Sequence, residues 1–218
     1  WRLLGWLEHE RLKYDYYAET QLDDGTLDLA AYRALITAVH PEYWTRKMYT
    51  EMKKWVFEQG GKLMYLGGNG LNCEVEFLDD KTIRVHNGIL KSLWAEGIGA
   101  ESRYAFRHES EVNLLGVVFT PAGIMTGAPY EVRNESHWVF RGTGLKNGQL
   151  FGTQSLHMRC PGGASGHETD KISASSPKNV ELLAKGTNPE NGGAEMTYFE
   201  TSSGGAVFSA GSITYPAS

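Results

Sequence analysis

The chain has 218 residues, of which 41% are hydrophobic and 22% are charged, and its formal net charge is −5. This length and apolar content suffice for the core of one sizeable globular domain. Both signs of charge are interspersed without a basic patch, so we do not expect nucleic acid as a partner. No apolar run approaches the ~18 residues that a membrane-spanning helix needs, so no membrane partner is expected either.

The two cysteines, Cys73 and Cys160, are too few for a disulfide framework and show no zinc-ligand spacing. We interpret both as thiols of a reducing compartment, which favours a cytoplasmic protein. The first residues carry charges within a short amphipathic stretch and do not resemble a signal peptide. Because the chain begins with Trp1, we expect residues 1–218 to be one domain taken from a longer chain.

The first half of the chain predicts alternating helices and strands. Residues 1–12 are expected to form a helix, residues 14–19 a short aromatic strand, and residues 32–39 a buried parallel strand. A second helix follows. Thr45 can cap its N-terminus, and Gly60 can accept the left-handed conformation at its end. One apolar face is predicted from positions i, i+4, i+7 and i+8, namely Met48, Met52, Trp55 and Val56.

A strand over residues 62–66 follows this helix directly, so strand, helix and strand form a βαβ unit and predict a parallel sheet. The second half is rich in glycine and predicts loops between short strands. These strands are expected at residues 73–78, 82–86, 114–120, 137–141, 180–184, 196–200 and 206–209. The expected fold class is therefore α/β, with a parallel sheet and a loop-rich β second half.

Polar loops follow both strands of the βαβ unit. Because ligands bind beyond the carboxyl ends of parallel strands, we expect these loops to share one edge. That neighbourhood would hold His40, Glu42, Tyr43, Tyr65 and Asn69. The run GGNG lacks the GK[ST] and GxGxxG patterns of nucleotide sites. Each loop also has a purely structural interpretation: GGNG as a turn that needs positive φ, and HPEYW as a helix entry with packing aromatics.

A third polar cluster is GHETD, which contains Glu168 and follows a glycine-rich loop. It is equally compatible with solvated surface and with acid/base groups beside a site.

At these motifs the sequence resembles a known family. The run LITAVHPEYWTRKMYTEMKKWVFEQGGKLMYLGGNG resembles the C-terminal domain of N,N-dimethylformamidase-type large (beta) subunits, and the likeness continues through LLGVVFT, GHETDK and GGAVFSAGSITYPAS. The resemblance implies a flavodoxin-like sheet related to class I glutamine amidotransferases. It also implies hydrolysis of a small amide to an amine and a carboxylic acid, a preceding β-rich domain, a small subunit and oligomerisation.

The resemblance further implies a mononuclear, ferric iron bound by two tyrosines and one glutamate. Carried over residue by residue, the metal ligands are Tyr43, Tyr65 and Glu101, with Glu96 as the competitor of Glu101. Three anionic oxygen ligands suit a hard ferric ion. The matching catalytic residues are Glu168 as the general base, with His40 and Asn69 as supporting or substrate-facing groups.

One departure leaves a second interpretation open. The family follows GGNG with aromatic residues, whereas this chain has Leu71-Asn72-Cys73. If a ligand tyrosine belongs to that run, the chain would be a non-catalytic domain that binds a small ligand or a subunit. A third interpretation, a glutamine-amidotransferase-like cysteine nucleophile, is disfavoured because Cys73 lies beyond the strand-to-helix elbow where such a nucleophile must stand.

Overall fold

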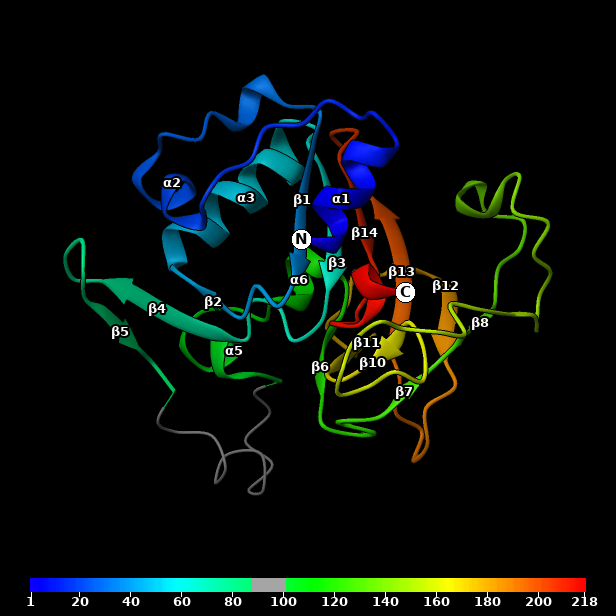
Figure 1. Cartoon of the computed structure of the whole chain (residues 1–218). Helices are drawn as coiled ribbons and strands as arrows, with labels where there is room; N and C mark the ends of the chain where they lie inside the picture. The colour runs from blue at the N-terminus through cyan, green and yellow to red at the C-terminus, as the bar shows by residue number, and fades with distance from the viewer. Residues whose placement is uncertain (88–100) are drawn as a thin grey trace.

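The computed structural model describes residues 1–87 and 101–218. Its first half is built on the predicted βαβ unit (Figure 1). Strand β1 (Ala34–Val39) pairs in parallel with β3 (Lys62–Gly67), and α3 (Arg46–Glu58) connects them in sequence. The Thr45 hydroxyl accepts the N–H of Met48, which confirms the predicted cap. The predicted apolar face of α3 is buried, together with Tyr49.

The main sheet is mixed, and the prediction of a parallel, flavodoxin-like or glutamine-amidotransferase-like sheet is wrong. Its seven strands run in the order β1-β3-β14-β13-β12-β8-β9. Only β1·β3 and β14·β3 are parallel, and the other pairs are antiparallel. The physical reason lies in the connections, because a parallel pair needs a long crossover whereas short glycine-rich turns join antiparallel neighbours.

Strand β14 (Ala206–Ser209) joins the two halves of this sheet. It runs parallel to β3 on one side and antiparallel to β13 (Glu195–Glu200) on the other. The antiparallel half continues through β12 (Glu181–Gly186), β8 (Tyr130–Val132) and β9 (Leu150–Phe151).

In the described part of the chain, three small sheets accompany the main one. The first is β2-β4-β5, formed by Tyr43–Trp44, Cys73–Phe77 and Ile83–Val85. The other two are β11·β6 (Thr169–Lys171 with Val118–Thr120) and β10·β7 (Ser165–Gly166 with Gly127–Ala128). In Figure 1 the β4–β5 hairpin projects away from the main sheet.

The other helices among the described residues are short. They are α1 (Arg2–His9), α2 (Glu19–Asp24), α5 (Arg103–Arg107), α6 (Val112–Leu115) and the 3-10 helices η1 (Leu29–Ala31), η2 (Trp138–Phe140) and η3 (Tyr215–Ala217). Among residues 1–87 and 101–218, no helix combines the length and the apolar character needed to span a bilayer. Both cysteines are free and buried, as the sequence predicted for unpaired thiols.

Several predicted strands are absent or shorter. Residues 14–18 form no strand, since the aromatic side chains make local contacts instead, such as the 2.7 Å hydrogen bond between the Tyr17 and Tyr32 hydroxyls. Residues 114–120 divide into α6 and β6, separated by Gly116 at φ +77°. Residues 137–141 form no strand and contain the 3-10 helix η2. The His137 side chain caps this helix by accepting the Val139 N–H. Strand β1 is an edge strand and is less buried than predicted.

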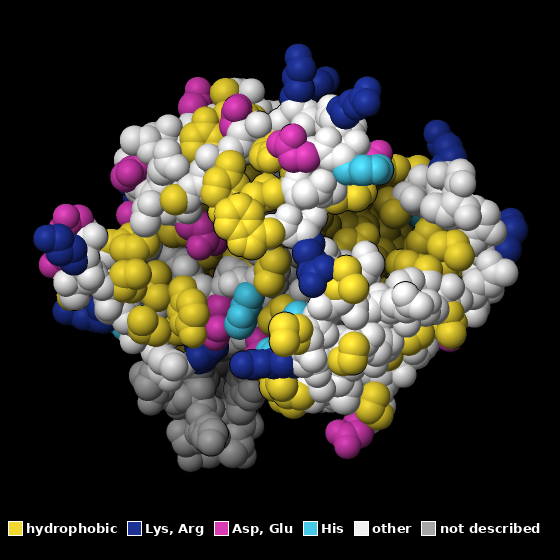
Figure 2. Space-filling model, viewed as in Figure 1, with side chains coloured by type: hydrophobic (Ala, Val, Ile, Leu, Met, Phe, Trp, Pro, Cys, Tyr) yellow, Lys and Arg dark blue, Asp and Glu magenta, His cyan; other side chains and the backbone are white. Residues whose placement is uncertain are grey.

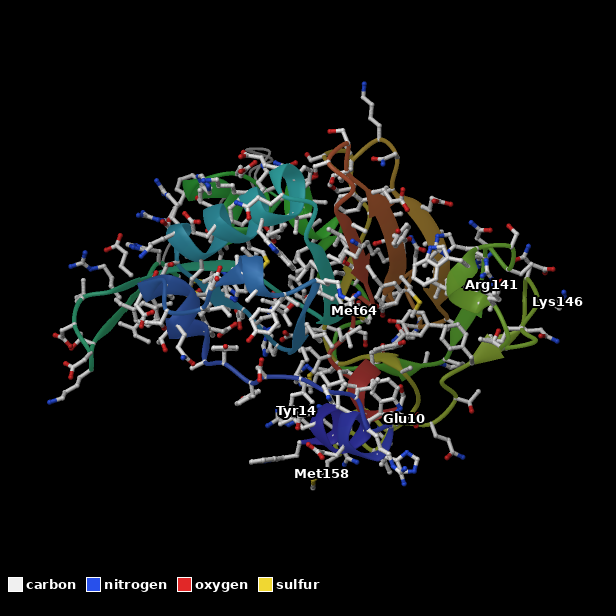
Figure 3. All side chains as sticks on the ribbon, turned by 90° about the horizontal axis from the view of Figure 1, so that it is seen from above. Glu10, Tyr14, Met64, Arg141, Lys146 and Met158 are labelled. Atoms are coloured by element: carbon white, nitrogen blue, oxygen red, sulfur yellow. The ribbon has the colours of Figure 1, made fainter. Side chains whose placement is uncertain are left out.

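Two hydrophobic clusters meet at β14. One contains the buried face of α3 and includes Val207, and the other lies in the antiparallel half and includes Ala206. Seen from above, α3 and α1 lie on opposite sides of β1 and β3, and the partly exposed Met64 of β3 lies between them (Figure 3). The main sheet therefore has its α3 face packed and its carboxyl edge at β1 and β3 free to carry loops.

Candidate functional site

The two predicted loops lie side by side at the carboxyl edge of β1 and β3. The parallel register places Val39 opposite Gly67, so the chain leaves both strands at the same level. Beyond the strands the loops remain hydrogen-bonded, because the Leu71 N–H donates to the Pro41 carbonyl at 2.8 Å and the Cys73 N–H donates to the Glu42 carbonyl at 3.0 Å. The sequence prediction that these loops share one edge is confirmed.

A third segment, just before β11, completes the site. Glu168 Oε2 lies 3.1 Å from His40 Nε2 and accepts a 2.9 Å hydrogen bond from the Asn69 side-chain amide. The same ring nitrogen faces a second carboxylate, with His40 Nε2 at 3.2 Å from Glu42 Oε2. Arg103 of α5 pairs with Glu42. Asn69 and Glu168, which are distant in sequence, thus both contact one imidazole, and Arg103 reaches it through Glu42.

The charges of this cluster balance each other. Hydrogen bonds to Glu168 and Glu42 raise the pKa of His40 from its usual 6.5 to about 9. In return, the bond from His40 holds the pKa of Glu168 below its usual range, although burial opposes the shift. Burial also acts to raise the pKa of Glu42, but His40 and Arg103 together lower it. At neutral pH the site therefore holds two carboxylates against an imidazolium and a guanidinium.

The cluster reaches solvent. The His40 side chain is 34% exposed and that of Glu168 is 19% exposed. In Figure 2, histidine and acidic side chains lie together at the surface near the lower end of β1. Both contacts of Glu168 use Oε2, so Oε1 has no hydrogen-bond partner within the described part of the chain. One carboxylate oxygen is consequently available to a bound water or substrate.

A buried layer lies directly beneath. Asp170 is 1% exposed, and its two oxygens accept the Asn69 backbone N–H at 2.8 Å and the Tyr65 hydroxyl at 2.7 Å. The Tyr65 hydroxyl in turn accepts the Gly70 N–H at 2.7 Å. Burial raises the pKa of Asp170 to about 7, against these bonds. Burial and the nearby Asp170 raise the pKa of Tyr65 well above its usual 10.

A sequence model of the family "N,N-dimethylformamidase beta subunit-like, C-terminal" matches residues 1–218. The chain belongs to this family. Two curated relatives share 26% identity with it, an N,N-dimethylformamidase beta subunit of Alcaligenes sp over 261 residues and one of Paracoccus aminophilus over 257 residues. Each alignment covers 98% of this chain and 33% of the relative. The chain therefore spans about a third of the length of these relatives.

The ligands predicted from the dimethylformamidase resemblance do not form a donor set in the structure. The Tyr43 side chain is 47% exposed, Tyr65 is fully buried with its proton held by Asp170, and Glu101 accepts a hydrogen bond from Ser110 at 2.8 Å. The competitor Glu96 lies outside the described residues. No contact joins Tyr43, Tyr65 and Glu101 in the described part of the chain, and no group of three or more His, Cys, Asp or Glu there could hold a metal.

The donor chemistry of Tyr65 also does not fit the implied iron. A ligand tyrosine must lose its proton, which requires a strong cation beside it. Tyr65 instead faces the acidic Asp170, which favours the protonated hydroxyl. The arrangement of this family member therefore does not fit an iron bound by Tyr43, Tyr65 and Glu101 together.

Sequence reasoning missed three residues of the site. Asp170 stood inside the GHETD motif, but nothing in the sequence placed it beneath the GGNG turn. The Asn72 side-chain amide donates a hydrogen bond to the side-chain oxygen of Asn69, and Asn72 was noted only as part of a departure from the family pattern. Arg103 carried no signal, because its partner Glu42 is 61 residues away.

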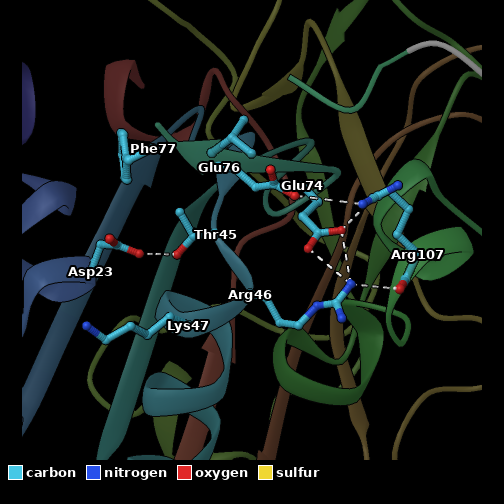
Figure 4. A pocket seen from close by; sticks show the side chains of 9 residues that line it. Asp23, Thr45, Arg46, Lys47, Glu74, Glu76, Phe77 and Arg107 are labelled. Atoms are coloured by element: carbon cyan, nitrogen blue, oxygen red, sulfur yellow. Dashed lines mark hydrogen bonds and ion pairs between the residues drawn. The ribbon is translucent and has the colours of Figure 1, made fainter. Parts of the chain in front are cut away.

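A separate polar cleft of about 430 Å³ lies at the N-terminus of α3 (Figure 4). Its buried Glu74 binds Arg46 at 3.1 Å and Arg107 at 2.7 Å. Since both arginines are already paired, this cleft is explained as an ion-pair network that attaches α5 to β4. The cluster at His40 remains the candidate site.

Proposed function

We propose that this chain forms the catalytic domain of an enzyme that hydrolyses a small amide, as the name of its dimethylformamidase relatives suggests. The observation that carries the proposal is the partly exposed Glu168 carboxylate, which His40 and Asn69 hold at 3.1 and 2.9 Å. A carboxylate fixed in this way, with one oxygen open, is suited to take a proton from water.

In the proposed reaction, water attacks the amide carbonyl carbon and its proton passes to Glu168. The tetrahedral species then collapses, the C–N bond breaks, and Glu168 returns the proton to the departing nitrogen. The products are a carboxylic acid and an amine. Because the general base is regenerated, one carboxylate serves both proton transfers.

The neighbouring groups orient that carboxylate. The His40 imidazolium and the Asn69 amide both contact Oε2, so they direct Oε1 toward the solvent-facing side. Glu42 contacts the same imidazole nitrogen, and Arg103 pairs with Glu42. An imidazolium beside the site also stabilises the negative charge that develops on the attacked carbonyl oxygen. The iron implied by the resemblance enters none of these steps, because its predicted ligands do not fit.

The proposal is tested by Glu168→Gln in the complete enzyme, which includes the full-length subunit and its partner subunits. Glutamine keeps the size of the side chain but cannot take the proton, so we expect turnover of a small N-alkylated formamide to fall by roughly 10²–10⁴-fold. The measurement is amine release under saturating substrate.

The matched control is Glu51→Gln on the exposed face of α3, which should retain full turnover. Unchanged turnover in Glu168→Gln would remove Glu168 from the proton transfer. A folded, assembled wild-type protein that binds formamides without releasing amine would favour the second candidate function, a non-catalytic binding domain. The separate positions of Tyr43, Tyr65 and Glu101 in the structure support this second candidate.

We further propose that the chain works within a multi-subunit assembly, since both relatives are named as beta subunits. Co-expression of the complete subunit with a candidate small subunit, followed by size-exclusion chromatography, tests this proposal. Co-elution in a fixed ratio is the expected result, and separate elution at micromolar concentration contradicts it.

A further inference from the structure

We propose that Asp170 and Tyr65 are a positioning pair that holds the Gly67–Gly70 turn so that Asn69 orients Glu168. The inference rests on the proposed function, because it assigns these residues to the same site. Neither residue touches a substrate in this proposal. They act through Asn69, whose side chain contacts both Glu168 and His40.

The first support is a continuous set of hydrogen bonds. The Gly70 N–H donates to the Tyr65 hydroxyl, which donates to Asp170, while the other Asp170 oxygen accepts the Asn69 N–H. Both carboxylate oxygens therefore act as acceptors, as an ionised carboxylate requires. The backbone N–H groups of Asn69 and Gly70, which are consecutive in the turn, are thus held by Asp170 and Tyr65, respectively.

The second support is the backbone of Asn69, which lies at φ +51°. This left-handed conformation is unfavourable for residues with a Cβ, and Asn tolerates it better than most. A turn with such a residue persists only when its surroundings hold it. In the GGNG turn it is thus the asparagine, and none of the glycines, that adopts a positive φ.

The third support is the tight packing of the glycines. A Cβ at Gly70 would lie 2.7 Å from the Tyr65 ring, and one at Gly68 would lie 2.3 Å from the Glu168 carbonyl oxygen. The turn is therefore pressed against Tyr65 on one side and against the backbone that carries Glu168 on the other. Movement of Tyr65 or Asp170 would be transmitted to Asn69 and then to Glu168.

The fourth support is the fixed orientation of the Asn69 side chain. Its carbonyl oxygen accepts from Asn72, and its amide nitrogen donates to Glu168 at 2.9 Å. Both ends of the Asn69 amide are thus engaged, and the backbone beneath them is held by Asp170. A shift of this backbone by about 1 Å would misplace Glu168, and misplacements of that size can reduce turnover by about 10²-fold.

The experiment compares Tyr65→Phe and Asp170→Asn with Tyr130→Phe in the complete enzyme. Tyr130 is a matched control, because it is equally buried and its hydroxyl donates to the Ala210 carbonyl at 2.7 Å rather than to Asp170 or the Gly67–Gly70 turn. Tyr65→Phe removes both hydroxyl bonds and keeps the ring. Asp170→Asn places an amide group where both donors need an acceptor.

In both variants we expect faster hydrogen exchange at the Asn69 and Gly70 amides, and kcat lower by about 10–100-fold with KM within about twofold. Tyr130→Phe should change neither quantity. If Asp170→Asn does not fold, Tyr65→Phe decides alone. Iron content is measured in parallel, and Tyr65→Phe should leave it unchanged.

Three results would overturn the inference: unchanged exchange, faster exchange with an unchanged kcat, or loss of bound iron in Tyr65→Phe, which would make Tyr65 a ligand. A wild-type enzyme without amide hydrolysis would instead remove the proposed function. The exchange data would still decide whether Asp170 and Tyr65 hold the turn, so the two failures are distinguishable.

Discussion

His40 is the residue at which the charges of the site meet. Its Nε2 lies between Glu168 at 3.1 Å and Glu42 at 3.2 Å, and Arg103 balances the second carboxylate. An imidazole between two carboxylates is protonated far above its usual range. The ionisation of His40 is therefore linked to that of Glu168, and the site is expected to respond to alkaline rather than to neutral pH.

We predict that kcat/KM for amide hydrolysis falls as the pH rises through about 9. His40 has a higher pKa in the folded chain than the usual 6.5, so its stabilising charge is fully present below about 6.5 and is lost as the pH passes about 9. On the acidic side the pKa of Glu168 is lowered, so the first group expected to take up a proton is Asp170, whose pKa is about 7.

The measurement is a pH–rate profile together with NMR titration of the His40 ring. His40→Gln should remove the alkaline decline and lower the plateau. A profile that stays level beyond pH 10, or an imidazole that titrates near 6.5, would contradict the assigned charge state.

The sequence predicted most of the side chains around His40, since His40, Glu42, Asn69 and Glu168 all belong to motifs that the sequence analysis identified. It could not predict which of them touch, because Glu168 and Asn69 are 99 residues apart. The places of Asp170 and Arg103 in the site were not predicted for the same reason. Their roles depend on buried partners contributed by other segments, and no local pattern records those partners.

The helix α3 is the element that sets the distance between the two site loops. Its start is fixed by Thr45, which caps Met48 and also bonds to Asp23 of α2. Because α3 begins one residue after β2, the cap also determines where the loop that carries His40 and Glu42 must end.

We predict that Thr45→Ala lowers the free energy of unfolding by about 1–2 kcal/mol, since one helix N–H loses its acceptor and the link to Asp23 is lost. Denaturant titration measures the change. The control is Thr50→Ala on the same helix, where the hydroxyl only bonds back to the Arg46 carbonyl and alanine has the higher helix propensity. Equal destabilisation by both substitutions would argue against the cap.

Elements with a strong local signal were predicted well, and α3, β3 and the β4–β5 hairpin are the examples. Residues 137–141 were mistaken for a strand because their apolar content suits either structure, and the capping of η2 by His137 decided the outcome. Short apolar runs do not distinguish a strand from a helical turn. The positions of the elements were thus predicted better than their types in the loop-rich half.

The whole molecule depends on β14, which belongs to both halves. Its neighbour β3 carries the site loop, and its neighbour β13 belongs to the antiparallel half. Alternation of side chains along a strand indicates which face is buried but not which strands pair, so the sequence predicted β14 without its partners. This is why the βαβ unit was correct and the fully parallel sheet was wrong.

We predict that Val207→Ala lowers the free energy of unfolding by roughly 2 kcal/mol, because Val207 is 1% exposed and loses two methyl groups in a packed core. Hydrogen exchange should become faster in β1–β3 and in β12–β13 alike. Leu150→Ala, an exposed position on the edge strand β9, is the control and should be nearly neutral. A loss of protection confined to one half would contradict the coupling through β14.

The late position of β14 in the chain has a consequence for biosynthesis. Of the seven strands of the main sheet, β14 is the last to leave the ribosome, although it lies near the middle of the sheet. Until it emerges, β3 and β13 each present an unpaired edge, and such edges invite pairing with other nascent chains. We therefore expect the emerging chain to need protection from aggregation that the finished domain, with both edges closed, no longer requires.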